Sequence, residues 1–309
     1  MINKNMQNPI FEELIKLKLI SKLNLITLSN RTRDKKIKVI KDLKTEIIFL
    51  EKYVTTNKYY SLLQYNDDDR KVFDKSIKKQ KFQTVKISSG NIRTPLIEDD
   101  YRRAVQYEKN LKNKDILDFG CGWCGFLRNV KNYKSLSGVE LRDECIKYVQ
   151  KNIKKIDISD NLNSFDKKFD IITMFDVLEH IPYQIKTLKV LKSKLKNKGK
   201  IIIEVPHAKD FLILQEELKE FKNFTFWSEH LILHTYKSLK SILLKSGFKN
   251  INIQYYQRYN FSNHLGWFLK RKPGGHSFYK EIISDSLNSS YCENLKKLGQ
   301  TDTLIAIAE

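Results

Sequence analysis

The sequence contains little cysteine, proline or glycine and no long apolar run. Its 309 residues include 4 Cys, 5 Pro and 11 Gly. Four scattered cysteines do not make a disulfide scaffold in a chain of this length, so a reduced, cytoplasmic setting is predicted. No stretch of 18 apolar residues occurs, which predicts that no segment spans a membrane. The N-terminal segment carries Glu12 and Glu13 and lacks a long apolar core, so it does not resemble a secretory signal.

Acidic residues are too few to balance the basic ones. The chain has 57 Lys and Arg against 36 Asp and Glu, a net charge of +21. Residues 1–110 hold 24 basic and 14 acidic residues, and residues 111–309 hold 33 and 22, so the excess is spread along the chain and is not gathered in a tail or arm. Most of the basic residues are lysines, whereas recognition of phosphates and bases favours arginine. The composition therefore favours a solvated basic surface over a nucleic-acid interface, without excluding nucleic acid.

Residues 1–110 predict a small α+β appendage. Its expected elements are a helix at 11–23, two strands within 36–53 that turn around Asp42, loop-like segments beside the acidic runs 66–69 and 98–100, and a helix at 99–111 that leads into the core.

From Asp115 onwards, predicted strands alternate with predicted helices. The expected strands are 115–120, 136–141, 154–159, 169–177, 201–207, 250–259 and 303–309. The expected helices are 126–133, 142–153, 183–196 and 236–248, with a turn at 197–200 and an irregular segment from 260 to about 300. This alternation predicts right-handed crossovers and a parallel sheet covered on both faces.

A glycine-rich turn, Gly120-x-Gly122-x-x-Gly125, follows the first strand of this region. The spacing fits a dinucleotide-binding loop, whose glycines let the backbone approach a ligand at a helix N-terminus. Asp118 argues against a pyrophosphate there, because its carboxylate would repel the phosphates, whereas it suits a ligand with a cationic amino group. Glu140, at the end of the second strand, can accept hydrogen bonds from both hydroxyls of a ribose.

Cys121 and Cys124 add a C-x-x-C spacing to this turn. Near a helix N-terminus they could form a redox pair. The structural interpretation is the stronger one, with Cys121 as a small apolar residue in a tight turn and Cys124 at the start of the helix. A metal site would need two more ligands, and neither a second C-x-x-C nor a nearby histidine pair supplies them, so no metal is predicted.

Several motifs in order resemble the class I S-adenosylmethionine-dependent methyltransferases, over about residues 100–255 and the final strand. They are "LDFGCGWCGFL", "GVEL", "FDIITMFDVLEHIP", "LKSKLKNKGKIIIEVPH" and "WSEHLILHTYKSLKSILLKSGF". The resemblance implies a Rossmann-like, doubly wound, seven-stranded, mostly parallel sheet with an antiparallel last strand. It also implies a methyltransferase domain at 101–309, with 256–300 as an insertion on the substrate side and 1–100 as a lid or interaction segment.

The resemblance further implies which residues bind S-adenosylmethionine. Asp118 would hold the amino group of the methionine part, and Glu140 would bind the ribose. Asp157 and Asp160 are alternatives for the adenine contact, with Asp160 preferred. The remaining expected cofactor residues are Gly120, Cys121, Gly122, Leu141, Phe175 and Asp176.

Methyl transfer to a hydroxyl requires an aligned oxygen nucleophile and benefits from a base near neutral pH. His180, after the fourth strand, and His230, in "WSEH", are the expected catalytic residues. The alternatives are that His180 packs over the cofactor or caps a helix, and that His230 holds its loop by a hydrogen bond. His234 is expected to be packed. Glu179 is expected to be an exposed acid at a helix start, with a hydrogen bond to either histidine as the alternative.

Residues 255–278 interleave aromatic and polar side chains, as a sugar-binding wall would. The expected substrate contacts are His207, Arg258, Asn263, His264 and His276. The segment resembles a subgroup of these methyltransferases associated with surface-polysaccharide or nucleotide-sugar modification, which implies O-methylation of a sugar or related small metabolite.

Two other functions stay open. The net charge would suit an RNA or DNA methyltransferase, but the fourth strand is not followed by the Asn/Asp-Pro-Pro-aromatic motif of enzymes that methylate base amines. A non-catalytic cofactor-binding partner subunit would show degraded motifs, whereas Glu140 and the glycine turn are intact. One role open to residues 1–110 is homodimerisation.

Overall fold

A computed structural model describes residues 7–53, 82–87, 90–95, 98–279 and 281–309. The chain divides into two compact units. The terminal unit comprises Met1–Val54, Asp176–Lys192 and Ile203–Glu309, and the central unit comprises Thr55–Phe175 and Ser193–Ile202. None of the described helices combines the length and the apolar character that crossing a membrane requires. The expected domain limits at residues 100 and 256 stay predictions.

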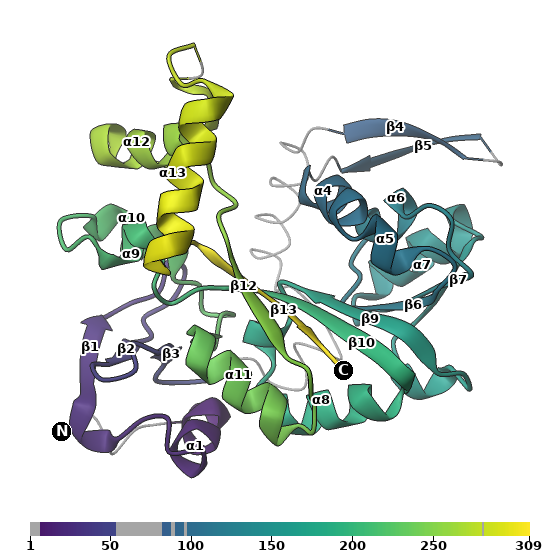
Figure 1. The fold of residues 1–309 in the computed structure, drawn as a ribbon, viewed down its shortest axis with the longest axis horizontal. Helices are drawn as coiled ribbons and strands as arrows, with labels where there is room; N and C mark the ends of the chain where they lie inside the picture. Colours follow the sequence, from purple (N-terminus) through teal and green to yellow (C-terminus); the bar gives the residue numbers. More distant parts are fainter. Residues whose placement is uncertain (1–6, 54–81, 88–89, 96–97, 280) are drawn as a thin grey trace. The chain divides into compact units, whose positions relative to one another are not determined.

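Seven strands form one mixed sheet (Figure 1). In spatial order they are β12 (Asn252–Tyr256), β13 (Thr303–Ala308), β10 (Leu195–Pro206), β9 (Phe169–Phe175), β6 (Asp115–Phe119), β7 (Ser135–Val139) and β8 (Ile156–Ser159). β6 pairs in parallel with β7 and β9, and β7 in parallel with β8, whereas β12 and β13 are antiparallel. The predicted Rossmann-like sheet with an antiparallel last strand is confirmed.

The central unit positions the ends of its strands through their register. β6 and β7 consist largely of buried residues, as strands covered on both faces do. Asp118 of β6 lies opposite Gly138 of β7 and Thr173 of β9. The carboxyl ends of these parallel strands therefore lie at one edge of the sheet, where doubly wound folds bind their ligands.

Helices and a ribbon complete the central unit. They are α4 (Glu98–Gln106), α5 (Glu108–Leu111), α6 (Gly125–Asn129), α7 (Asp143–Asn152), the 3₁₀ turn η3 (Leu162–Ser164) and the antiparallel ribbon of β4 (Phe82–Ile87) and β5 (Gly90–Pro95). The helix predicted at 99–111 is present but breaks at Tyr107 into α4 and α5. The acidic residues 98–100, expected beside a loop, instead form the first turn of α4, where negative charge favours the helix dipole.

The terminal unit contains a second, four-stranded antiparallel sheet. Its strands in spatial order are β1 (Leu25–Ser29), β2 (Val39–Asp42), β3 (Ile48–Leu50) and β11 (Ile232–Leu233). Helix α1 (Pro9–Lys16) buries its apolar face in the same core, where the ring of Phe11 lies 6.0 Å from that of Phe49. The backbone turns after β2 because the Asp42 carboxylate accepts a hydrogen bond from the Thr45 amide at 2.8 Å. The predicted strand pair is confirmed. The helix predicted at 11–23 is present but ends at Lys16, and Lys18 has a left-handed φ of +55°.

The remaining elements among the described residues are helical. They are η2 (Lys22–Asn24), η4 (Leu178–His180), α8 (Gln184–Ser193), α9 (Phe211–Leu214), α10 (Lys219–Thr225), α11 (Tyr236–Lys245), α12 (Phe261–Lys270), η5 (Gly275–Ser277) and α13 (Asp285–Leu298).

The prediction of an irregular segment from 260 to about 300 is wrong, because α12 and α13 lie there. The Asn260 side chain caps α12 by accepting a hydrogen bond from the Asn263 amide, and Ser284 caps α13 through the Leu287 amide. Gly299, with φ of +63°, ends α13 in the left-handed conformation that glycine adopts readily. Capping residues define these helices more clearly than their mixed aromatic and polar composition does.

Two further predictions need correction. Residues 197–200, predicted to form a turn, lie inside β10. Within them, the left-handed backbone of Lys198, with φ of +60°, departs from an extended strand. The helix predicted at 126–133 already ends at Asn129, since the next residue, Val130, is extended. The acidic run 66–69 lies outside the described residues.

Candidate active site

The glycine turn of the central unit folds back onto β7. Gly120 and Gly122 have φ of +83° and +53°, which side chains with a Cβ disfavour. The amides of Gly120 and Cys121 both donate to the Val139 carbonyl, at 2.8 and 3.0 Å. A Cβ on Gly138 would lie 2.6 Å from the Cys121 sulfur, so β7 needs a glycine for the turn to pack on it. The turn is therefore fixed by backbone bonds and close packing.

Asp118 lies buried at the end of β6, with 4% of its surface exposed. Its carboxyl group accepts a hydrogen bond from the Thr173 hydroxyl at 2.7 Å. Burial, with smaller contributions from the nearby acids Asp100 and Glu140, raises the pKa of Asp118 to about 7, against the lowering effects of the Thr173 hydrogen bond and the Arg103 charge. A buried acid whose ionisation is suppressed in this way is stabilised as a carboxylate when a cationic group comes close to it.

Glu140 follows β7 and is held as a carboxylate. It accepts hydrogen bonds from the amides of Gly122 at 2.7 Å, Leu141 at 2.9 Å and Arg142 at 3.0 Å, and from the Arg142 guanidinium at 3.1 and 3.2 Å. Burial alone would raise the pKa of Glu140, but the charge and hydrogen bonds of Arg142 bring it below the ordinary value. Glu140 is thus a fixed, ionised acceptor beside the glycine turn.

Helix α4 brings charged residues next to this turn. Asp100 lies against Gly125, where a Cβ would come within 1.9 Å of its carboxylate. The buried Arg103 places its guanidinium 4.7 Å from the centre of the Phe175 ring. Phe175 also stacks on Tyr107 and meets the edge of Phe126, at ring distances of 5.9 and 4.9 Å. The proximity of Asp100 and Arg103 to this turn was not predicted from the sequence.

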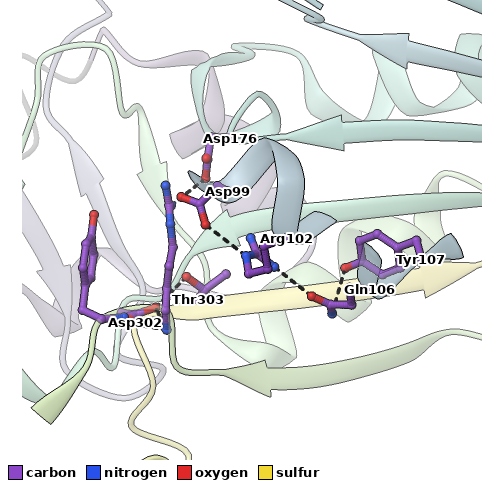
Figure 2. A network of polar contacts seen from close by, with 9 residues as sticks. Asp99, Arg102, Gln106, Tyr107, Asp176, Asp302 and Thr303 are labelled. Atoms are coloured by element: carbon purple, nitrogen blue, oxygen red, sulfur yellow. Dashed lines mark hydrogen bonds and ion pairs between the residues drawn. The ribbon is translucent and has the colours of Figure 1, made fainter. Parts of the chain in front are cut away.

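A ladder of polar contacts stiffens α4 (Figure 2). Arg102 donates to Asp99 at 3.0 Å and to Gln106 at 2.8 Å, and Gln106 donates to the Tyr107 hydroxyl at 3.4 Å. The i, i+3 and i, i+4 spacing places these side chains on one helical face. These hydrogen bonds hold Tyr107, whose ring stacks on Phe175.

The terminal unit contains a cavity of about 400 Å³, called the terminal-unit cavity below. Its aromatic walls are Phe221, Phe224, Trp227, Tyr259 and Trp267. Its charged and polar lining includes Arg33, Asp176, Glu179, His207, Asp210, His230, Arg258, Asn263, His276 and Asp302. Size and lining suit a small polar molecule that carries flat or apolar faces.

Two histidines lie together, and one of them, His230, lines this cavity. The rings of His180 and His230 are 4.9 Å apart and nearly perpendicular. Burial lowers the pKa of both, to about 3 for His230, where the neighbouring His180 contributes. Glu179, expected to be exposed, is instead fully buried, and its carboxylate lies 3.8 Å from the His180 Nε2. Both imidazoles are therefore neutral at pH 7.

Comparison with known proteins assigns this fold to a family. Residues 91–253, more than half of the chain, match the family described as "Methyltransferase domain". The chain is a methyltransferase of this family. It is 30% identical over 155 residues to a tRNA U34 carboxymethyltransferase of Nautilia profundicola, an alignment that covers 46% of this chain and 50% of that protein. A protein of the same name from Aliarcobacter butzleri is 29% identical over 175 residues, covering 51% of this chain and 56% of that protein.

Among solved structures, the methyltransferase is similar to a SAM-dependent methyltransferase from Archaeoglobus fulgidus. The sequence identity is 23% and the TM-score 0.46, and the alignment covers 68% of this chain and 91% of that one. The chain spans 50–66% of the length of the curated relatives it matches.

The central unit of this methyltransferase domain fits S-adenosylmethionine as the methyl donor. The cofactor supplies an activated methyl group together with its leaving group. Asp118 would balance its cationic amino group, the left-handed glycines Gly120 and Gly122 would let the backbone approach it, and Glu140 would accept the ribose hydroxyls. Glu140 would then exchange guanidinium bonds of Arg142 for hydroxyl donors.

The other expected cofactor residues lie in different surroundings. Cys121 is buried beneath the turn, and Leu141 is 41% exposed. Asp160 is exposed directly after β8, whereas Asp157 lies within that strand. Phe175 belongs to the central unit, and Asp176 belongs to the terminal unit and lines its cavity. Their contacts with the cofactor stay predictions.

Four of the five expected substrate residues line the terminal-unit cavity. His207 is buried and bonded through Nδ1 to the Thr301 carbonyl, and Arg258 pairs with Asp176 at 3.4 Å. Asn263 and His276 also line the cavity. His264 is instead bonded to Gln257 and Tyr291 behind this wall, and its substrate role stays an untested prediction. His234, as expected, is buried and bonded to Ser238.

Cys121 and Cys124 lie within the glycine turn. The sulfurs of Cys121 and Cys124 are 3.5 Å apart, and both residues are buried. The hydrogen bond between them, with burial, raises the pKa of the Cys121 thiol well above its ordinary value. A thiol that stays protonated is a poor nucleophile, which favours a packing role for Cys121 over a redox role.

Proposed function

We propose that this methyltransferase transfers the methyl group of S-adenosylmethionine to an oxygen of a sugar, in a nucleotide-sugar, a surface glycan or a related small metabolite. One observation carries the proposal, namely the lining of the terminal-unit cavity. Trp227, Tyr259 and Trp267 line it with aromatic rings, which can contact the C–H patches of a sugar, and Arg258 and Asn263 carry donors for its hydroxyls.

The insertion predicted at 256–300 supplies much of this wall, which supports its assignment to the substrate side. The link to surface polysaccharides stays a prediction, since none of the relatives named above is described by it. A lid or dimerisation role for residues 1–100 also stays a proposal.

His180 and His230 are the proposed catalytic residues. Both are neutral at pH 7, and His230 lines the cavity. A pKa of about 3 makes the His230 imidazole a weak proton acceptor, so His180 is the proposed base and the variant test is made there. His180→Ala is expected to lower kcat about 100-fold and to change the Kd for S-adenosylmethionine less than about twofold. Equal turnover in the variant would reduce His180 to a packing residue. His234→Ala, a buried histidine outside the cavity lining, controls for losses of stability.

A tRNA uridine is the second candidate acceptor. It is favoured by the names of the two curated relatives and by the net charge of +21. Basic residues promote binding to polyanions in a salt-dependent manner, so a nucleic-acid acceptor would be bound much more weakly at high salt.

Transfer of a labelled methyl group distinguishes the candidates. The full chain is incubated with methyl-labelled S-adenosylmethionine and, separately, nucleotide-sugars, glycan fragments and total tRNA. We expect the labelled methyl group to appear in the nucleotide-sugar or glycan incubation. We also expect this labelling to persist when the salt concentration is raised. Label found only in tRNA would overturn the sugar acceptor, and absence of cofactor binding by calorimetry would contradict the cofactor site itself.

A further inference from the structure

Glu179, His180 and His230 bring three metal-binding side chains together at the terminal-unit cavity. One ligand atom from each lies within 4.8 Å of those of the other two. Glu179 and His230 line the cavity directly. No metal was expected from the sequence, because the two histidines are 50 positions apart and their proximity depends on the fold.

Backbone bonds hold the three residues in place. Glu179 and His180 are neighbours in η4, and the Leu231 amide donates to the Glu179 carbonyl at 2.9 Å. His230, just before Leu231, donates its own amide to the Trp227 carbonyl at 3.2 Å. β11 then continues into pairing with β3. The segment that carries His230 is thus fixed to the turn that carries the other two side chains.

We propose that Glu179, His180 and His230 bind a divalent transition-metal ion that faces the terminal-unit cavity. Two imidazoles and a carboxylate suit Mn²⁺, Fe²⁺, Co²⁺ or Zn²⁺, whereas Mg²⁺ and Ca²⁺ prefer oxygen ligands. Bonds of about 2.0–2.2 Å place ligand atoms roughly 3–3.5 Å apart, so the most distant of these ligand atoms must approach one another by up to about 1–2 Å on binding.

The acceptor class inferred below rests on the proposed function, whereas the metal site itself does not. With His180 and His230 as metal ligands, the bound ion takes the place of a free imidazole in activating the acceptor hydroxyl. Three protein ligands leave coordination positions open for acceptor oxygens, as in catalytic metal sites. A coordinated hydroxyl loses its proton more readily, so its O–H bond breaks, the proton passes to water, and the electron pair stays on the metal-bound oxygen. The inferred acceptor class is a molecule with two adjacent hydroxyls, which can chelate the ion and which sugars provide.

Metal binding is tested without the acceptor or the cofactor. The full chain, stripped with chelator, is titrated with Co²⁺ alone by calorimetry and visible absorption, and with Mn²⁺ and Zn²⁺ by calorimetry. We expect one equivalent to bind, with visible bands that indicate bound Co²⁺. Glu179→Gln and His230→Gln are each expected to weaken binding at least about 100-fold, more than the loss of an outer-shell partner does.

His276→Gln is the matched control, because His276 is an exposed histidine that lines the same cavity outside the cluster. Its metal affinity should equal that of the unmodified chain. If Glu179→Gln does not fold, His230→Gln and the imidazole nitrogen couplings in pulsed EPR of Mn²⁺ bound to the unmodified chain decide the question instead.

Two results would overturn the inference: no stoichiometric binding of any of the three ions at about 0.1 mM, or unchanged affinity in both variants. Cofactor affinity measured on the same stripped protein separates the two proposals. If cofactor affinity is intact while metal binding is absent, only the metal site is contradicted. If cofactor affinity is lost while the metal still binds, the proposed function is contradicted and the metal site is retained.

Discussion

The two units build their sites in different ways. In the central unit, Asp118, the glycine turn and Glu140 lie within 23 consecutive residues, on neighbouring parallel strands. In the terminal unit, the cavity is assembled from segments that range from Arg33 to Thr303. The first site depends on strand register and local backbone, and the second depends on the packing of distant loops and helices.

This difference has a consequence for mutational analysis. A change at the glycine turn should act on cofactor binding alone, because its supporting bonds are local. A change in the terminal-unit cavity should act on the acceptor and on the stability of its unit. The following predictions test that separation, beginning with the largest expected effect.

Glu140→Ala should weaken S-adenosylmethionine binding by at least about 100-fold, on the order of 3 kcal/mol. The Glu140 carboxylate accepts hydrogen bonds from the Gly122 amide and the Arg142 guanidinium. The variant loses these bonds together with the charged acceptor for the ribose. Calorimetric titration with the cofactor measures the loss. Glu144→Ala, an exposed acid on α7, should bind normally. Normal binding by Glu140→Ala as well would reject the site.

Affinity for the cofactor should rise with pH up to about pH 7. Asp118 has a pKa of about 7 in the free protein, and a cationic ligand requires its ionised form. Binding must therefore release a proton at lower pH, which strengthens affinity by up to about tenfold per pH unit. Asp118→Asn should bind more weakly and lose this dependence between pH 5.5 and 7.5. An identical slope in both proteins would assign the titration to another group.

The stability of the free protein should show the opposite slope. The pKa of folded Asp118 lies above the ordinary value of 3.8, so its neutral form contributes stability below about pH 4 that is lost as pH rises through about 7. Asp118→Asn, which is always neutral, should lose less stability than the unmodified chain over this range in thermal unfolding. This comparison separates the titration of Asp118 from that of the cofactor.

Arg33→Ala should have the smallest effect, about 1 kcal/mol of unfolding free energy. The guanidinium lies 4.2 Å from the centre of the Phe224 ring and 4.4 Å from that of Trp227, and exposed cation–π contacts contribute roughly this amount. Denaturant unfolding measures the change, with Arg31→Ala as the control on the same loop. Cofactor affinity should be unaltered in both variants. A drop in cofactor affinity would show that the two sites are energetically coupled.

The elements of the sheet could be predicted because their patterns are local. "DILDF" and "FDIITMF" are apolar runs of strand length, and α7 and α11 have helical periodicity between turn residues. The helices α12 and α13 were missed for a physical reason. Their faces mix aromatic and polar residues, and the start of each helix is marked by a single capping side chain, Asn260 for α12 and Ser284 for α13.

The candidate site shows the same limit. Asp118 and Glu140 could be predicted from their places after strands, whereas Arg103 and Arg33 could not, since no local pattern connects them to Phe175 or Trp227. The same holds for Glu179, whose burial beside two histidines depends on a contact between residues 179 and 231. Sequence patterns predict where strands end, but they do not predict which residues far apart in the sequence come into contact.

The burial of three of the four thiols also has a practical use. Cys121, Cys124 and Cys145 lie inside the protein, whereas Cys292 on α13 is partly accessible. A thiol-directed fluorophore would therefore attach at one helix of the terminal unit, without any substitution of the natural cysteines. Such a label would give a spectroscopic reporter for acceptor screening that leaves the methyl-donor turn unmodified.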